Sequence, residues 1–170
     1  MMIKISAGLE RAFATGGFHE PSVEDLRDAA GVSLRTLYKY VPSRDDMVHA
    51  ALEYRNGRYL EHVFQDLPKA PEEALETILE RVAKWMETEA SHGCLFHEAV
   101  AASPKDVRLR ELLMRHKSEF ACKAAKAVGM RHAQLELMLI LEGLMQNWPL
   151  FHEAALEASK RLGLALLRAD

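Results

Sequence analysis

The 170-residue chain is 49% hydrophobic, which is enough to bury a core as one domain or as a small domain joined to a larger one. Its formal charge is −3, from 22 Lys and Arg against 25 Asp and Glu, so the molecule as a whole is not attracted to polyanions. No apolar run reaches the roughly 20 residues that span a bilayer and the N-terminus lacks a signal-peptide pattern, so we expect a cytoplasmic protein with no membrane insertion.

The pattern along the chain predicts an all-α protein. Alternation of apolar and polar residues at the period of a strand is scarce, and proline and glycine divide the chain into about nine helical segments. Ile5, Leu9 and Phe13 form the apolar stripe of the first helix, which Gly16 and Gly17 end. The first three segments are short, and the fourth is long.

Capping residues bound the second and third segments. Ser22 is followed three residues later by Asp25, the spacing of a capping box, and Gly31 permits a tight turn after that helix. Ser33 then caps the third helix, which Pro42 closes because a proline disfavours helical geometry in the residue before it. Two short helices joined in this way make a helix-turn-helix, whose second helix can enter the major groove of DNA.

The third helix has an apolar and a polar face. With Leu37 at the centre of the buried face, Val41, Leu34 and Tyr40 are predicted to lie beside it. The opposite face gathers side chains of the kinds that contact phosphates and base edges, namely Arg35, Thr36, Tyr38 and Lys39. Residues 31–44 hold three cations and no carboxylate. An ordinary solvated face is the alternative, since amphipathic helices often carry cations outside.

The stretch GFHEPSVEDLRDAAGVSLRTLYKYVPSRDDMVHAAL, residues 17–52, resembles the DNA-binding domain of TetR-type transcriptional regulators. The resemblance implies a three-helix DNA-binding domain at residues 1–46 and a helical ligand-binding and dimerisation domain at residues 47–170. It also implies that Ser22 and Tyr38 hold phosphates, as does Arg44 in place of the usual lysine, and that Arg35, Thr36 and Lys39 face the groove. The predicted DNA-binding set is Ser22, Ser33, Arg35, Thr36, Tyr38, Lys39 and Arg44.

Three positions of the third helix depart from the pattern of the family. Arg35 stands where the family usually has glycine, Leu34 stands where it often has a polar or basic residue, and Tyr40-Val41 replaces His-Phe. The first two departures bear on which operator sequence is bound, not on the mode of binding.

The rest of the chain carries no enzyme signature. His97-Glu98 and His152-Glu153 each begin an HExxH motif but lack its second histidine, and glycine-rich cofactor loops are absent, so we expect no catalytic activity and no cofactor. His92, Cys94 and His97 are metal-ligand types that lie close together. The same turn resembles one in some TetR-type regulatory domains in which the cysteine packs, so no metal is predicted.

Large apolar side chains in the second part of the chain could line a cavity for an apolar effector, or could be plain core. His116 falls on the same apolar stripe, where the alternative is a core histidine with a satisfied hydrogen bond. The candidate pocket residues are Trp85, Met86, Phe96, Met114, His116, Phe120, Met138 and Met145.

The last two predicted helices, which divide at Pro149, have more apolar surface than one side of a small bundle needs. Small residues near position 155 allow close helix approach, as in a symmetric four-helix interface between two copies. The candidate dimer residues are Leu135, Met138, Leu139, Glu142, Met145, Trp148, Phe151, Ala155, Ala158 and Leu162.

Two functions are compatible with these features. The first is a homodimeric repressor that binds a palindromic operator in double-stranded DNA and is released by a small, apolar effector. The second is a lipid or isoprenoid carrier of the TetR fold that does not bind DNA. The acid-free outer face of the third helix favours the first, because a carrier has no need of it.

Overall fold

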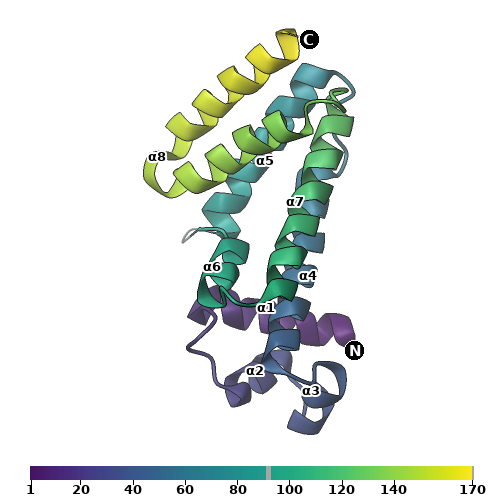
Figure 1. Cartoon of the computed structure of the whole chain (residues 1–170), viewed down its shortest axis with the longest axis vertical. Coiled ribbons are helices and arrows are strands. Elements are labelled where there is room, and N and C mark those ends of the chain that lie inside the picture. Colours follow the sequence, from purple (N-terminus) through teal and green to yellow (C-terminus); the bar gives the residue numbers. More distant parts are fainter. Residues whose placement is uncertain (91–92, 170) are drawn as a thin grey trace. The chain divides into compact units, whose positions relative to one another are not determined.

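The computed structural model describes residues 1–90 and 93–169, and the regular structure within them is helical, as predicted (Figure 1). Within these residues, no helix has the length and apolar character needed to cross a membrane. The helices are α1 (Met2–Gly16), α2 (Val23–Ala30), α3 (Leu34–Tyr40), α4 (Arg44–Phe64), α5 (Pro71–Glu89), α6 (Leu95–Ala102), α7 (Val107–Ala127) and α8 (Gln134–Arg168).

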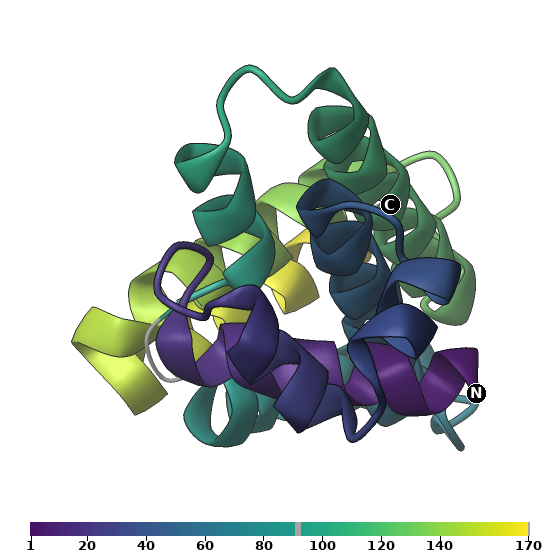
Figure 2. The ribbon, with the colours of Figure 1, turned by 90° about the horizontal axis from the view of Figure 1, so that it is seen from below.

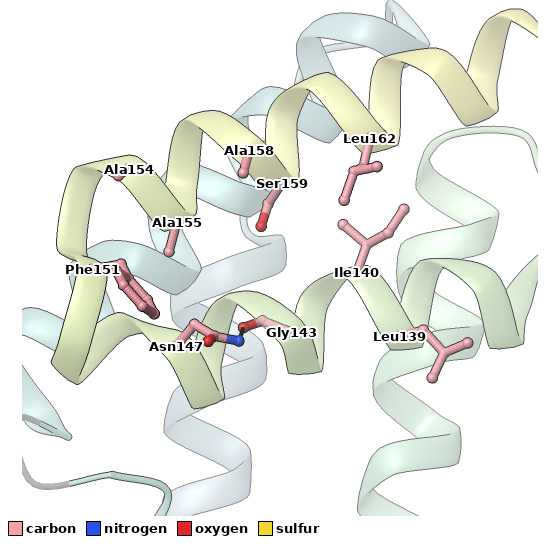
Figure 3. Close-up of a pocket in the computed structure, with 10 residues that line it drawn as sticks. All are labelled: Leu139, Ile140, Gly143, Asn147, Phe151, Ala154, Ala155, Ala158, Ser159 and Leu162. Atoms are coloured by element: carbon pink, nitrogen blue, oxygen red, sulfur yellow. Dashed lines mark hydrogen bonds between the residues drawn. The ribbon is translucent and has the colours of Figure 1, made fainter.

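Helix α8 contains both of the last two predicted helices, so the described residues form eight helices where about nine were expected. The break predicted at Pro149 lies further along, at His152, whose backbone has φ 42° and ψ −122°. This left-handed φ is uncommon outside glycine, so the bend is a strained point rather than a simple proline stop. The two arms of α8 diverge from this bend (Figure 3).

The chain forms two compact units. The N-terminal unit comprises Met1–Arg58 and Leu95–Leu113, and the C-terminal unit comprises Tyr59–Cys94 and Met114–Asp170. The predicted division at residues 46 and 47 therefore does not coincide with the compact units. The reason is that apolar side chains beyond residue 46 are buried in the N-terminal core, among them Met47, Leu52, Leu95, Leu109 and Leu112.

In the N-terminal unit, α1 packs on α2 and α2 packs on α3 (Figures 1 and 2). Ile5, Leu9 and Phe13 are fully buried, as their four-residue spacing predicted. Gly8 lies against the last turn of α2, where a Cβ atom on it would come within 2.5 Å of the Ala30 Cα. The absence of a side chain at position 8 therefore allows the close approach of α1 and α2.

The core of the C-terminal unit lies between α5, α7 and α8. Aliphatic residues of α5 and α8 are fully buried there, including Ile78, Leu79, Leu137 and Leu141. Aromatic rings extend this core, because Tyr59 stacks on Phe120 with ring centroids 5.1 Å apart and meets Trp85 at 5.2 Å. Burial raises the pKa of the Tyr59 hydroxyl well above its usual value, so this group is a neutral hydrogen-bond donor.

Candidate nucleic-acid interface

Helix α2 begins with the predicted capping box. The Ser22 Oγ accepts a hydrogen bond from the Asp25 amide at 3.2 Å, and the Ser22 amide donates to Asp25 Oδ2 at 2.8 Å. Hydrogen bonds from the Ser22 hydroxyl and amide lower the pKa of the Asp25 carboxyl below its usual value. The helix ends at Gly31, which has left-handed backbone angles of φ 61° and ψ 43° and makes the turn into α3.

Helix α3 is capped by Ser33, whose Oγ accepts from the Thr36 amide at 3.1 Å. The hydroxyl groups of Ser33 and Thr36 also share a hydrogen bond of 2.8 Å. Leu37 and Val41 are completely buried and attach this seven-residue helix to the N-terminal core. The cap and the two apolar anchors together determine which face of α3 is exposed.

The outward face of α3 contains the predicted cations. Arg35, Tyr38 and Lys39 are exposed and Thr36 is half-buried. Leu34 and Tyr40 are exposed as well, so the prediction that they lie beside Leu37 on the buried face was wrong. This short helix contacts the core only through Leu37 and Val41, so the side chains on either side of them remain in solvent.

Arg44 has a structural role that its sequence position did not indicate. Its Nη2 donates to the Phe18 carbonyl oxygen at 2.9 Å, and the guanidinium lies 5.9 Å from the centre of the Phe13 ring. These contacts fasten the beginning of α4 to the loop that follows α1. A phosphate contact by Arg44 would have to use the remaining guanidinium hydrogens.

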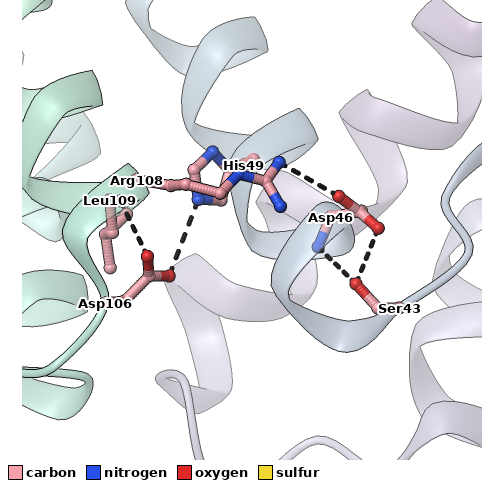
Figure 4. Close-up of polar contacts among 6 residues, drawn as sticks. All are labelled: Ser43, Asp46, His49, Asp106, Arg108 and Leu109. Carbon is pink, nitrogen blue, oxygen red and sulfur yellow. Dashed lines mark hydrogen bonds and ion pairs between the residues drawn. The ribbon is translucent and has the colours of Figure 1, made fainter.

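A polar network joins the first turns of α4 and α7 within the N-terminal unit (Figure 4). Ser43 caps α4 by accepting from the Asp46 amide at 3.1 Å, and its hydroxyl donates to the Asp46 carboxylate at 2.6 Å. Arg108 donates to the same carboxylate at 3.3 Å, and His49 Nε2 lies 3.7 Å from Asp106 Oδ2. The Ser43 hydroxyl and then Arg108 lower the pKa of Asp46. The base of α4 is therefore anchored on two sides.

A buried ion pair holds α1 against α4, and the sequence analysis missed it. Glu10 and Arg55 each expose only 4% of their side chains and are hydrogen-bonded to one another. Arg58 lies 3.3 Å from the other Glu10 oxygen. The one local signal was that Glu10 directly follows Leu9 of the apolar stripe, and nothing near it pointed to partners 45 residues away.

The comparisons with known proteins agree with this geometry. Residues 5–51 match the family model described as bacterial regulatory proteins of the tetR family. Residues 5–51 are a helix-turn-helix domain of the TetR family. The matched range covers α1 to α3 and the beginning of α4, which are the elements that hold the outward face of α3 in position.

The whole chain, TetR-family domain included, has the fold of solved TetR-family regulators. A TetR-family transcriptional regulator from Streptomyces coelicolor has a TM-score of 0.81 and 19% identity, over 98% of this chain and 93% of that one. A putative one from Rhodococcus sp. has a TM-score of 0.76 and 20% identity, over 97% of both chains. One from Haloarcula marismortui has a TM-score of 0.76 and 16% identity, over 99% and 96%. The comparison with curated proteins gave no match.

Beyond the TetR-family domain, the candidate pocket residues are distributed over both units. Trp85, Met86, His116, Phe120 and Met145 are buried in the C-terminal unit and Met138 is half-buried there. Met114 is 70% exposed, because two positions from the buried Leu112 it points away from the apolar stripe of α7. Phe96 packs against the core of the N-terminal unit. Met114 therefore faces solvent, and Phe96 belongs to the core of the N-terminal unit.

The metal-ligand alternative concerned His92, Cys94 and His97. His92 lies outside the described residues. Among the residues that are described, no group of three or more His, Cys, Asp or Glu side chains is placed to hold a metal ion. Cys94 is partly buried and Cys122 is exposed, and the two are not joined in a disulfide.

An apolar groove of about 550 Å³ lies between the two arms of α8 (Figure 3). The large exposed side chains along α8 are Leu135, Leu139, Leu150, Phe151 and Leu162, four of which belong to the predicted dimer set. The groove also has a floor of small residues, which are Gly143, Ala154, Ala155, Ala158 and Ser159. The arrangement leaves an apolar surface uncovered on one side of the unit.

Four members of the predicted dimer set are engaged within their own unit. Met145, Trp148 and Ala155 are buried in the core of the C-terminal unit. Glu142 forms an ion pair with Lys117 of α7. These side chains are engaged because α8 must also cover α5 and α7, which requires one side of an apolar helix. The remaining exposed residues outline the surface open to a partner.

Proposed function

We propose that this protein is a transcriptional repressor that binds a palindromic operator as a homodimer and leaves it when a small, apolar effector binds. In this proposal residues 1–46 bind DNA, and residues 47–170 bind the effector and dimerise. The observation that carries the proposal is the exposed face of α3, which presents Arg35 and Lys39 and has no carboxylate. A surface of this kind is suited to the polyanionic major groove, although the chain as a whole is acidic.

The DNA contacts divide into two kinds. Arg35, Thr36 and Lys39 lie on the part of α3 that would enter the groove and contact bases. Ser22 at the N-cap of α2, Ser33 at the N-cap of α3 and Tyr38 on α3 have exposed hydroxyl groups, which suit phosphate oxygens. Phosphate contacts position the helix, and base contacts select the sequence.

The groove of α8 supports the homodimer. A second copy can cover it symmetrically, with each exposed Leu139 and Leu162 meeting the small-residue floor of the partner. A dimer with a twofold axis through this interface would carry two α3 helices. Such a pair would bind two half-sites that lie one duplex turn apart, about 34 to 36 Å. The operator is accordingly expected to be palindromic.

The interior of the C-terminal unit supports an apolar effector. Trp85, Phe120 and Met145 provide aromatic and sulfur surface, and the Tyr59 hydroxyl donates to the Met145 sulfur at 3.4 Å, a weak acceptor that an effector could replace. Helix α4 contributes residues to both units and would carry the change to the DNA-binding side. A hundredfold loss of operator affinity needs about 2.7 kcal/mol of coupling.

An electrophoretic mobility-shift assay tests the DNA-binding half of the proposal. The purified protein would be titrated with the intergenic DNA beside its own gene over a series of salt concentrations. We expect a shifted band whose affinity falls steeply with salt, since cations released from phosphates drive such binding. The absence of a shifted band, or an affinity that does not change with salt concentration, contradicts the proposal. A lipid recovered by solvent extraction from a protein that does not bind DNA would support the carrier function instead.

Replacing Arg35 or Lys39 by alanine is expected to weaken specific DNA binding by about 1–3 kcal/mol, because each removes one base contact. Fluorescence anisotropy with a labelled operator measures the loss. Lys126→Ala is the matched control, since it removes an exposed cation from α7. Both α3 variants should keep the thermal unfolding curve of the wild type. A variant that loses its dimer, or that binds as tightly as the control, contradicts the assignment of this face.

Replacing Leu139 by alanine is expected to raise the dissociation constant of the dimer by about tenfold or more, because each interface loses buried apolar surface from two copies. Leu139 is 65% exposed in the single chain and lines the groove. Analytical ultracentrifugation over a dilution series measures the constant. Met114→Ala removes a similarly exposed apolar side chain outside the groove and should leave it unchanged. Equal effects of the two variants count against this interface.

A further inference from the structure

The outward face of α3 has side chains that suit some bases and not others. Its exposed or half-buried side chains are Leu34, Arg35, Thr36, Tyr38, Lys39 and Tyr40. Two of these are cationic donors, and none is an amide or a carboxylate. Guanine is read by Arg or Lys at O6 and N7, adenine by Asn or Gln at N6 and N7, and cytosine by Asp or Glu at N4. Helix α3 therefore has the partners for guanine and lacks those for adenine and cytosine.

Three carboxylates of the flanking helices α2 and α4 are hydrogen-bonded inside the unit. Asp25 accepts from Ser22 in the capping box. Asp28 accepts from Arg27 Nε at 2.8 Å. Asp46 accepts from Ser43 at the start of α4. None of these three carboxylates belongs to α3 itself.

Thr36 is fixed in a way that favours contact through its methyl group. Its hydroxyl lies 2.8 Å from the Ser33 hydroxyl, and its amide donates to the same Ser33 oxygen. With the hydroxyl held at the cap, the γ-methyl is the other group on the Thr36 Cβ. Leu34, one helical turn from Tyr38, is exposed on the other flank of the helix, so Thr36 alone supplies the methyl group on its side. Methyl and aliphatic groups in the major groove read the C5-methyl group of thymine.

We infer that each operator half-site is recognised through guanine and thymine edges, with Arg35 and Lys39 on guanines and the Thr36 methyl against a thymine methyl. This inference rests on the proposed function and specifies its DNA target. Arg35 and Lys39 are one helical turn apart, about 6 Å along the axis, which is about two base-pair steps. The two guanines accordingly lie close together in the half-site. Adenine is left without an amide that bonds N6 and N7 together, and cytosine N4 is left without a carboxylate of α3.

Selection from a pool of random duplexes with the full-length protein gives the operator, and base analogues then test the inference. 7-Deazaguanine removes the N7 acceptor, and deoxyuridine removes the thymine methyl. We expect about a tenfold loss of affinity for a contacted guanine and about a fourfold loss for the thymine. 7-Deazaadenine, the matched control, should change affinity less than twofold. A larger loss with 7-deazaadenine than with 7-deazaguanine, or a selected site without guanine, overturns the inference. Failure to enrich any sequence overturns the proposed function itself.

Protein variants assign each base contact to a side chain. In Arg35→Ala and Lys39→Ala, 7-deazaguanine at one guanine each should no longer reduce affinity, because the contact is already gone. Thr36→Ser keeps the hydroxyl that bonds Ser33 and removes the methyl, so its affinity should become insensitive to deoxyuridine. Circular dichroism shows whether each variant is folded as the wild type. Analogue effects that persist unchanged in all three folded variants contradict the assignment.

Discussion

Replacing Glu10 by glutamine is expected to lower the free energy of unfolding by about 3–5 kcal/mol. Glutamine keeps the shape of the side chain but removes its charge, which takes the Glu10 carboxylate away from the buried Arg55 guanidinium. The cost arises because an ion removed from water loses several kcal/mol of solvation that only a well-placed partner restores. Urea unfolding followed by circular dichroism, at one fixed protein concentration, measures the change.

Two control variants separate a buried charge from lost packing. Replacing Glu10 and Arg55 together by leucine removes both charges, and most of the lost stability should return. Glu87→Gln breaks the exposed pair with Lys84, in which both side chains are more than half exposed, and should barely change stability. If Glu10→Gln behaves like Glu87→Gln, the pair is solvated in solution and does not hold α1 against α4.

Local signals in the sequence predicted the features whose atoms lie within a few residues of each other. The capping box of Ser22 and Asp25, the left-handed Gly31 and the cap at Ser33 involve groups at most four positions apart. The exposure of Arg35 and Lys39 also followed, since both lie opposite Leu37 on a helix. For these reasons the helix-turn-helix could be derived from the sequence alone.

Features that depend on tertiary contacts could not be predicted in this way. Leu34 and Tyr40 were placed on the buried face because a single helix does not indicate how wide its contact with the neighbouring helices is. Glu10 and Arg55 come together only when α1 lies on α4. The bend lies at His152, which is not a glycine, so the sequence did not indicate a left-handed residue there. In each case the deciding partner is distant in the sequence.

Helix α8 shows the same limit for the choice between core and interface. Leu139 and Met145 are both apolar and both were expected at the dimer surface, but Leu139 is exposed and Met145 is buried. Hydrophobicity alone predicts that each prefers to leave water. Which of them does so within one chain depends on where α5 and α7 lie against α8.

The second large effect is expected from Gly8→Ala, which should lower the free energy of unfolding by about 3 kcal/mol. The added Cβ would overlap the Ala29 carbonyl oxygen and come within 2.5 Å of the Ala30 Cα. These are backbone atoms of α2, so no side chain can rotate away and α1 and α2 must separate. Since α2 supports α3, affinity for the operator should fall as well. Urea unfolding and operator titration measure the two losses.

Gly57→Ala is the matched control in the same unit. It lies inside α4, where a Cβ would meet nothing within 4 Å, so the better helix propensity of alanine should raise stability by about 1 kcal/mol. The better helix propensity of alanine should also raise stability at position 8 in α1, so a loss of stability there must come from the overlap with α2. If Gly8→Ala lowers the free energy of unfolding and Gly57→Ala raises it, the loss at position 8 comes from the close approach of α1 and α2. A stabilised Gly8→Ala variant would mean that the two helices leave room for a methyl group between them.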